Sequence, residues 1–106
     1  MTHVIVDPGI CGFTTDIKVE AADMGEVNIA VDTKCTMIAK LVEGLEQPVD
    51  AFAVIGMTGN TPLLETARQG ARIHAACPTI AGIVKAVEVE AQMALPRDAS
   101  LRFVSE

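Results

Sequence analysis

A chain of 106 residues, half of them hydrophobic, is long enough to form one domain around a single core, and we expect residues 1–106 to be that domain. Only 3% of the residues are aromatic, with no Trp or Tyr, so the core must be aliphatic and a surface that stacks nucleotide bases is not expected. The net charge of −6 argues against nucleic acid and against anionic membrane surfaces as partners. We also expect a cytoplasmic protein, because no hydrophobic run reaches the ~18 residues of a membrane-spanning helix and the start lacks the basic segment of a signal peptide.

The first third of the chain has the pattern of β-strands. A Val-Ile-Val run within residues 2–6 predicts a short strand that is buried on both faces, and Asp-Pro-Gly follows it. Apolar and polar residues alternate over 15–21 and again over 26–32, with a turn sequence at 22–25 between them. This alternation predicts an antiparallel hairpin.

Helical spacing of apolar residues begins after the hairpin. It predicts a helix over 36–45. Residues 49–57 are apolar and fit either a short helix or a buried strand. Thr61 and Pro62 suit the N-cap and the first position of a further helix, which we expect to run to about Gln69.

The longest predicted helix begins at Pro78, and Pro96 closes its pattern. Leu101 and Phe103 then alternate with polar neighbours, which predicts a short last strand over 100–104. Strands, then helices, then one closing strand indicate an α+β fold. We expect a small antiparallel sheet with helices packed on one face.

The three cysteines all lie where strands or loops give way to the next element. Cys11 is flanked by glycines in a loop that can present successive N–H groups to an anion. Cys35 and Cys77 directly precede predicted helices, where unpaired N–H groups and the helix dipole favour a thiolate. An odd number of cysteines without a secretory signal favours reduced thiols or metal ligands over disulfides. The alternative is that each cysteine is a small, inert hydrophobic residue.

These segments resemble those of the IscU/NifU iron–sulfur cluster assembly scaffolds over about residues 9–92. The Cys11 loop and the strand residues 16–19 are similar to the first cysteine region of that family. Cys35, at the start of a helix, is similar to its second cysteine region. The segment 72–77 and the long helix after it are similar to its His-Cys segment and C-terminal helix.

The resemblance implies an IscU-like α+β domain in which Cys11, Cys35 and Cys77 hold a 2Fe–2S or 4Fe–4S cluster. Three cysteines leave one iron position open, and His74, Asp7, water, substrate or a partner's thiol could fill it. Phe13 stands where the family carries an Asp, and two alanines separate His74 from the last cysteine. The implied function is therefore cluster binding as a divergent scaffold, carrier or electron-transfer module. The implied partners are a cysteine desulfurase or an apo-protein acceptor, and a homodimer that shares the cluster is left open.

Other functions fit the same residues. Cys11, Cys35, Cys77 and His74 form a Cys₃His set that suits zinc in a structural or regulatory site. Cys77 is also a candidate nucleophile activated by His74, but no orienting acid is evident, so we expect a binding protein rather than an enzyme. In a metal-free interaction domain, serine would replace all three cysteines with little effect beyond stability.

Overall fold

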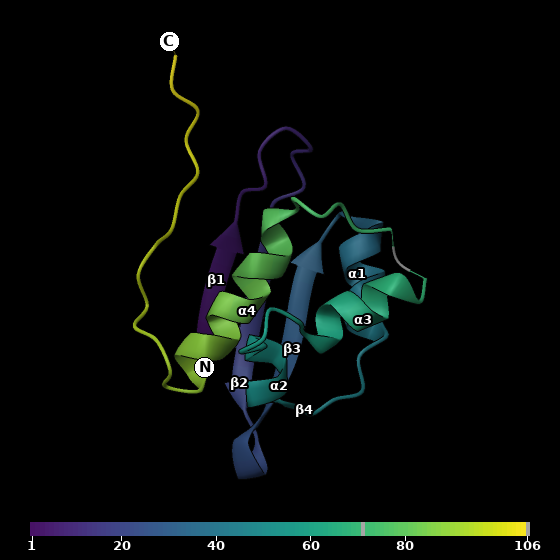
Figure 1. Ribbon diagram of the computed structural model, residues 1–106, viewed down its shortest axis with the longest axis vertical. Coiled ribbons are helices and arrows are strands. Elements are labelled where there is room, and N and C mark those ends of the chain that lie inside the picture. The colour runs from purple at the N-terminus through teal and green to yellow at the C-terminus, as the bar shows by residue number, and fades with distance from the viewer. Residues whose placement is uncertain (71, 106) are drawn as a thin grey trace.

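One antiparallel sheet and the helices packed on it form the two layers of this computed structural model, which describes residues 1–70 and 72–105 (Figure 1). Within those residues the sheet order is β1-β2-β3-β4, and every pair of neighbouring strands is antiparallel. The strands are β1 (Thr2–Val6), β2 (Thr15–Ala21), β3 (Glu26–Thr33) and β4 (Val49–Asp50). The helices are α1 (Thr36–Glu43), α2 (Ala51–Ile55), α3 (Pro62–Arg68) and α4 (Pro78–Glu90), with a 3₁₀ turn, η1 (Asp23–Gly25). The predicted α+β fold is confirmed.

The hairpin of β2 and β3 is confirmed almost to the residue. Its register runs from the Thr15–Thr33 pair to the Ala21–Val27 pair. Gly25 in the connecting turn has a φ of 77°, a left-handed conformation that glycine adopts without a steric penalty. The glycine in the turn and the alternation in the strands therefore indicate the same hairpin.

The predicted helices are also present. α1 lies within the expected range, and Thr61 and Cys77 are the N-caps that precede Pro62 and Pro78 at the first positions of α3 and α4. The ambiguous segment 49–57 contains both alternatives, because a two-residue strand, β4, passes directly into the short helix α2.

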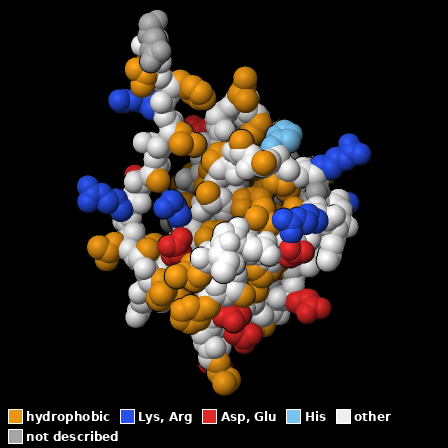
Figure 2. All heavy atoms as spheres, viewed as in Figure 1, with side chains coloured by type: hydrophobic (Ala, Val, Ile, Leu, Met, Phe, Trp, Pro, Cys, Tyr) orange, Lys and Arg blue, Asp and Glu red, His pale blue; other side chains and the backbone are white. Residues whose placement is uncertain are grey.

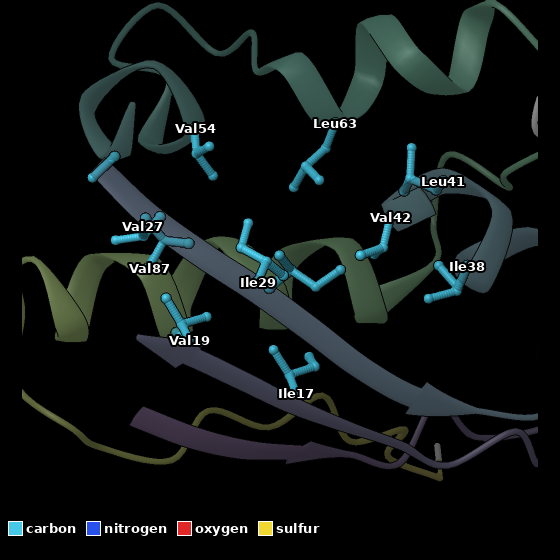
Figure 3. Packing of buried hydrophobic residues seen from close by; sticks show 13 residues of the cluster. Ile17, Val19, Val27, Ile29, Ile38, Leu41, Val42, Val54, Leu63 and Val87 are labelled. Atoms are coloured by element: carbon cyan, nitrogen blue, oxygen red, sulfur yellow. The ribbon is translucent and has the colours of Figure 1, made fainter. Parts of the chain in front are cut away.

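The hydrophobic core lies between the sheet and the helices (Figure 3). Alternate residues of the hairpin point into it, and those at its centre are no more than 4% exposed, while their neighbours face the uncovered side of the sheet. From the hairpin the core receives Ile17, Val19, Val27 and Ile29, and from the four helices Ile38, Leu41, Val54, Leu63, Ile83 and Val87, among others. The core is aliphatic, as the composition requires.

The prediction that β1 is buried on both faces is wrong. In the described residues β1 is an edge strand that pairs only with β2, and no helix among them covers the outer face of the sheet. Val4 and Val6 therefore point toward α4 and are half-buried, whereas Ile5 points to the open face and is 64% exposed.

The predicted strand over 100–104 is wrong as well. α4 ends at Glu90, and residues 94–105 are extended, exposed and not assigned to a strand. No backbone hydrogen bond joins residues 94–105 to the described part of the sheet. Alternation of Leu101 and Phe103 is a local pattern, and it yields a strand only where the edge of a sheet accepts its backbone.

Glu90 ties the end of α4 to the sheet. The Thr2 hydroxyl donates to Oε1 at 2.7 Å, the Ala21 N–H donates to Oε2 at 2.9 Å, and the Met1 amino group lies 3.5 Å from Oε1. The Thr2 hydrogen bond first, and then the Ala21 N–H and the amino group, hold the pKa of Glu90 below its ordinary value of 4.5, against the opposing effect of burial.

We expect Glu90→Gln to lower the free energy of unfolding by about 1 kcal/mol at neutral pH, because the charge-assisted bonds are lost. A lowered folded-state pKa contributes stability that is present above the unfolded value and is lost as the pH falls through the folded value. The difference between Glu90→Gln and wild type should therefore shrink below pH 4.5. Urea unfolding across this range measures it, with Glu88→Gln as the control on the same helix; an unchanged difference at low pH would contradict the assignment.

Candidate functional site

The three segments that carry the cysteines lie at the same end of the sheet (Figure 1). β1 and β3 run in the same direction, so the loop after β1 that carries Cys11 and the connection after β3 that carries Cys35 leave the sheet at one end. α4 packs against β1 and runs antiparallel to it, so Cys77 at its start lies at that end too. Residues that are far apart in the sequence are thus brought to one end of the sheet. We call this end, which carries Cys11, Cys35 and Cys77, the cysteine rim.

Two threonine hydroxyls that hydrogen-bond to one another fix the backbone just before Cys35. Thr15, fully buried, donates from Oγ1 to Thr33 Oγ1 at 2.8 Å, and Thr33 Oγ1 in turn accepts the Cys35 N–H at 3.1 Å. Thr15 Oγ1 also lies 3.2 Å from the Phe13 carbonyl, at the end of the Cys11 loop. This pair therefore connects both cysteine-bearing segments to adjacent strands.

Cys35 and Cys77 are alike in their surroundings. Each is the N-cap of its helix in extended conformation, makes no side-chain capping bond and is half-buried against the core. The first N–H groups of α1 and α4 have no partner within their own helix, so they are available to hydrogen-bond an acceptor bound beside each sulfur.

His74 lies on a tight turn with Cys77. The Cys77 N–H donates to the His74 carbonyl at 3.0 Å, and the His74 side chain is exposed. This turn brings the two residues together in space as well as in sequence. Nearby, the Arg72 N–H lies 3.4 Å from Met37 Sδ, which joins the segment before α4 to the first turn of α1.

The Cys11 loop is the most open part of the rim. Its hydrogen bonds are local: Gly9 N–H to Asp7 Oδ1 at 3.1 Å and Gly12 N–H to the Gly9 carbonyl at 3.0 Å. Cys11 and Ile10 are exposed, and an atom added at either glycine would meet nothing within 4 Å. The loop has room to change conformation without disturbing the core.

The rim does not hold a preformed metal site in the described residues, 1–70 and 72–105. No three His, Cys, Asp or Glu side chains there are close enough together to bind one ion. All three cysteines are free thiols. The structure thus gathers Cys11, Cys35, Cys77 and His74 at one end, and their role as a joint ligand set stays a prediction.

The sequence interpretation missed Thr15 and Thr33. Thr15 begins the first predicted strand and Thr33 follows the last residue of the second, but a threonine at the end of a strand pattern carries no sign that it faces another threonine. The strand register creates the pair, and the register could have been counted outward from the 22–25 turn.

A model of the family of unknown function DUF6951 matches residues 2–103. The chain belongs to this family. No curated protein and no solved structure matches the chain. The match begins in β1 and continues beyond α4, so the DUF6951 pattern includes the cysteine rim and most of the extended segment that follows α4.

The DUF6951 structure also has an open hollow of about 520 Å³ beside α2 and α3, away from the cysteines. Phe52, Met57, Asn60, Thr61 and Glu65 are among its lining residues. Thr61 Oγ1 is buried there without a hydrogen-bond partner, and Asn60 and Arg68 both bind Glu65. In the described part of this DUF6951 chain, no helix has the length and apolar character needed to cross a membrane.

Proposed function

We propose that this DUF6951 protein binds an iron–sulfur cluster through Cys11, Cys35 and Cys77, as a divergent relative of the IscU/NifU scaffolds. The observation that carries the proposal is that three separate segments, each with one free thiol, lie at the same end of the sheet. Thiolates are the ligands that hold iron–sulfur clusters in proteins. The donor set therefore fits the chemistry of such a cluster.

In this proposal the cysteines have two roles. Cys35 and Cys77 provide fixed thiolates, because helix starts packed on the core position them. Cys11 completes the set when its open loop closes toward the other two, which its local hydrogen bonding permits. The thiolates would neutralise the charge of the iron, and the unpaired N–H groups at the starts of α1 and α4 would stabilise the sulfurs.

Zinc is the second candidate, and one observation favours it. The His74–Cys77 turn places an imidazole beside a thiol, and a Cys₃His set is a common structural zinc site. The same four residues would then serve structure or regulation, and the cysteine substitutions below would release zinc rather than iron.

The cellular setting follows from the proposed cargo. Three free thiols suit a cytoplasmic location, where cysteines remain reduced. A cysteine desulfurase would supply the sulfide, and an apo-protein acceptor would receive a cluster that is passed on. The role is binding, as a scaffold, carrier or electron-transfer module, rather than catalysis.

Anaerobic purification followed by a visible spectrum and by iron, sulfide and zinc analysis tests the proposal. We expect iron and sulfide in similar amounts, and we expect Cys11→Ser, Cys35→Ser and Cys77→Ser each to lose them. Ala76→Ser is the matched control, since it adds a hydroxyl beside Cys77 and removes no thiol.

Two results would oppose the cluster assignment in different ways. A colourless protein whose zinc is lost in the cysteine variants would establish the zinc site instead. No metal after reconstitution, or metal retained in all three serine variants, would remove both assignments and leave a metal-free domain.

A further inference from the structure

The two edges of the sheet differ, because one is paired and the other is open. Beyond β3, the Val27–Val49 pair joins β4 to the sheet, and the Gln47 side chain continues the pairing. Its Nε2 donates to the Ile29 carbonyl at 2.9 Å, and its Oε1 accepts the Ile29 N–H at 2.6 Å. The other edge, the outer side of β1, has no pairing strand or side chain among residues 1–70 and 72–105. An unpaired strand edge is a template for another strand.

The segment after α4, residues 94–105, has the properties of a strand without a partner. Its described backbone makes no hydrogen bond to the body, and in Figures 1 and 2 it stands away from the two layers. Leu101 is 88% exposed and Phe103 is fully exposed, although both lie within the family match. Hydrophobic residues in alternation with Arg102 are typical of a strand that has one covered and one open face.

The direction of the chain favours an edge on another molecule. α4 runs antiparallel to β1, so the segment turns back and runs parallel to β1 of its own chain. All other neighbouring strands in the sheet are antiparallel, and parallel pairing is slightly less stable per residue. A second copy can present its β1 in the antiparallel direction. The segment can reach it, since twelve extended residues span roughly 40 Å.

Charge supports the same pairing. The open face of the sheet beside β1 carries three carboxylates, one lysine and one histidine, the last bound to Asp16 at 2.8 Å. They are Asp16, Glu20, Asp32, Lys18 and His3. Within the segment, residues 99–104 carry Arg102 as their one charged side chain. A stretch whose only charge is positive therefore meets a face with a negative balance.

We propose that residues 99–104 of one copy pair as an added strand with the open edge of β1 in a second copy, and that two chains exchange these segments in a two-fold dimer. Leu101 and Phe103 then extend the apolar layer of Val4 and Val6. Arg102 lies on the open face with the carboxylates. Such reciprocal exchange of a terminal element is a recognised route to symmetric dimers.

Light scattering over a wide range of protein concentration, with a metal chelator present, tests the dimer separately from any shared cluster. We expect wild type to reach twice the mass of one chain, and deletion of residues 97–106 to give a monomer. Phe103→Asp should raise the dimer dissociation constant at least about thirtyfold, since an aromatic anchor is lost. Met24→Asp is the control, because Met24 is equally exposed but lies at the far turn of the hairpin.

The edge is tested by Ile5→Lys, which puts a like charge on the face that receives Arg102 and should also weaken the dimer. A mixture of the deleted chain and the Ile5→Lys chain should restore a heterodimer, since one supplies an intact edge and the other an intact segment. A monomer at all concentrations would overturn the proposal. A dimer that survives the deletion, or a monomer whose segment is protected from hydrogen exchange, would overturn it too.

Discussion

Replacing Ile17 with alanine is expected to lower the free energy of unfolding by about 2–5 kcal/mol. Ile17 is fully buried in β2, pairs with Val4 and Val31 on either side, and lies under α4. Its removal leaves a cavity that neither the sheet nor the helix can close without moving the other. A loss of this size is a large fraction of the ~5–15 kcal/mol that stabilises a domain. Urea unfolding followed by circular dichroism measures it.

Lys18→Ala is the matched control for Ile17→Ala. Lys18 is the next residue of the same strand, and its side chain is exposed on the open face. We expect a change within about 0.5 kcal/mol for Lys18→Ala, and a loss of about 0.5–1.5 kcal/mol for Ile17→Val, which removes one methyl group. If Lys18→Ala were as damaging as Ile17→Ala, the assignment of the two faces of β2 would be wrong.

The hairpin could be predicted from the sequence because three local signals agree there. Residues 15–21 and 26–32 alternate with a period of two, and the turn at 22–25 contains glycine. Alternation assigns a covered face to each strand, and the turn sets the register between them. No distant residue is needed for either inference.

The strand over 2–6 and the segment over 100–104 depend on distant residues. A continuous Val-Ile-Val run shows that a strand is apolar, but not whether it is central or at an edge. The outer position of β1 follows from the β4 and Gln47 pairing at the opposite edge, which leaves β1 as the end of the sheet. The alternation of Leu101 and Phe103 predicts a strand only if an edge accepts it.

In the candidate site, too, some features follow from the local sequence and others depend on distant residues. The sequence placed Cys35 and Cys77 at helix starts, and that local assignment is confirmed. Their arrival at one end with Cys11 follows from the strand directions, which the hairpin and the α4 packing set. The distances between the sulfurs depend on the conformation of the open Cys11 loop, and no periodic pattern encodes that conformation.

Gly82→Ala is expected to destabilise the fold by about 1–3 kcal/mol, although alanine is the better helix former by about 1 kcal/mol. Gly82 is buried where α4 crosses the sheet, and a Cβ at this position would lie 2.3 Å from Val6 Cγ2 and 3.4 Å from Ile17 Cδ1. A valine side chain cannot rotate away freely, because branching at its β-carbon restricts χ1. The helix would have to lift from β1, one turn after the Cys77 cap.

If this clash causes the loss of stability, a second substitution that removes the colliding methyl group should restore part of it. Val6→Ala removes the colliding methyl group, so the Val6→Ala/Gly82→Ala variant should be more stable than the sum of the two single changes predicts, by about 0.5–3 kcal/mol in a double-mutant cycle. Ala81→Gly, at an exposed position of the same helix, measures the propensity effect of glycine alone. Additive single effects would mean that α4 does not depend on Val6 for its position, and the close contact between this helix and β1 would then not be what fixes Cys77 at the rim.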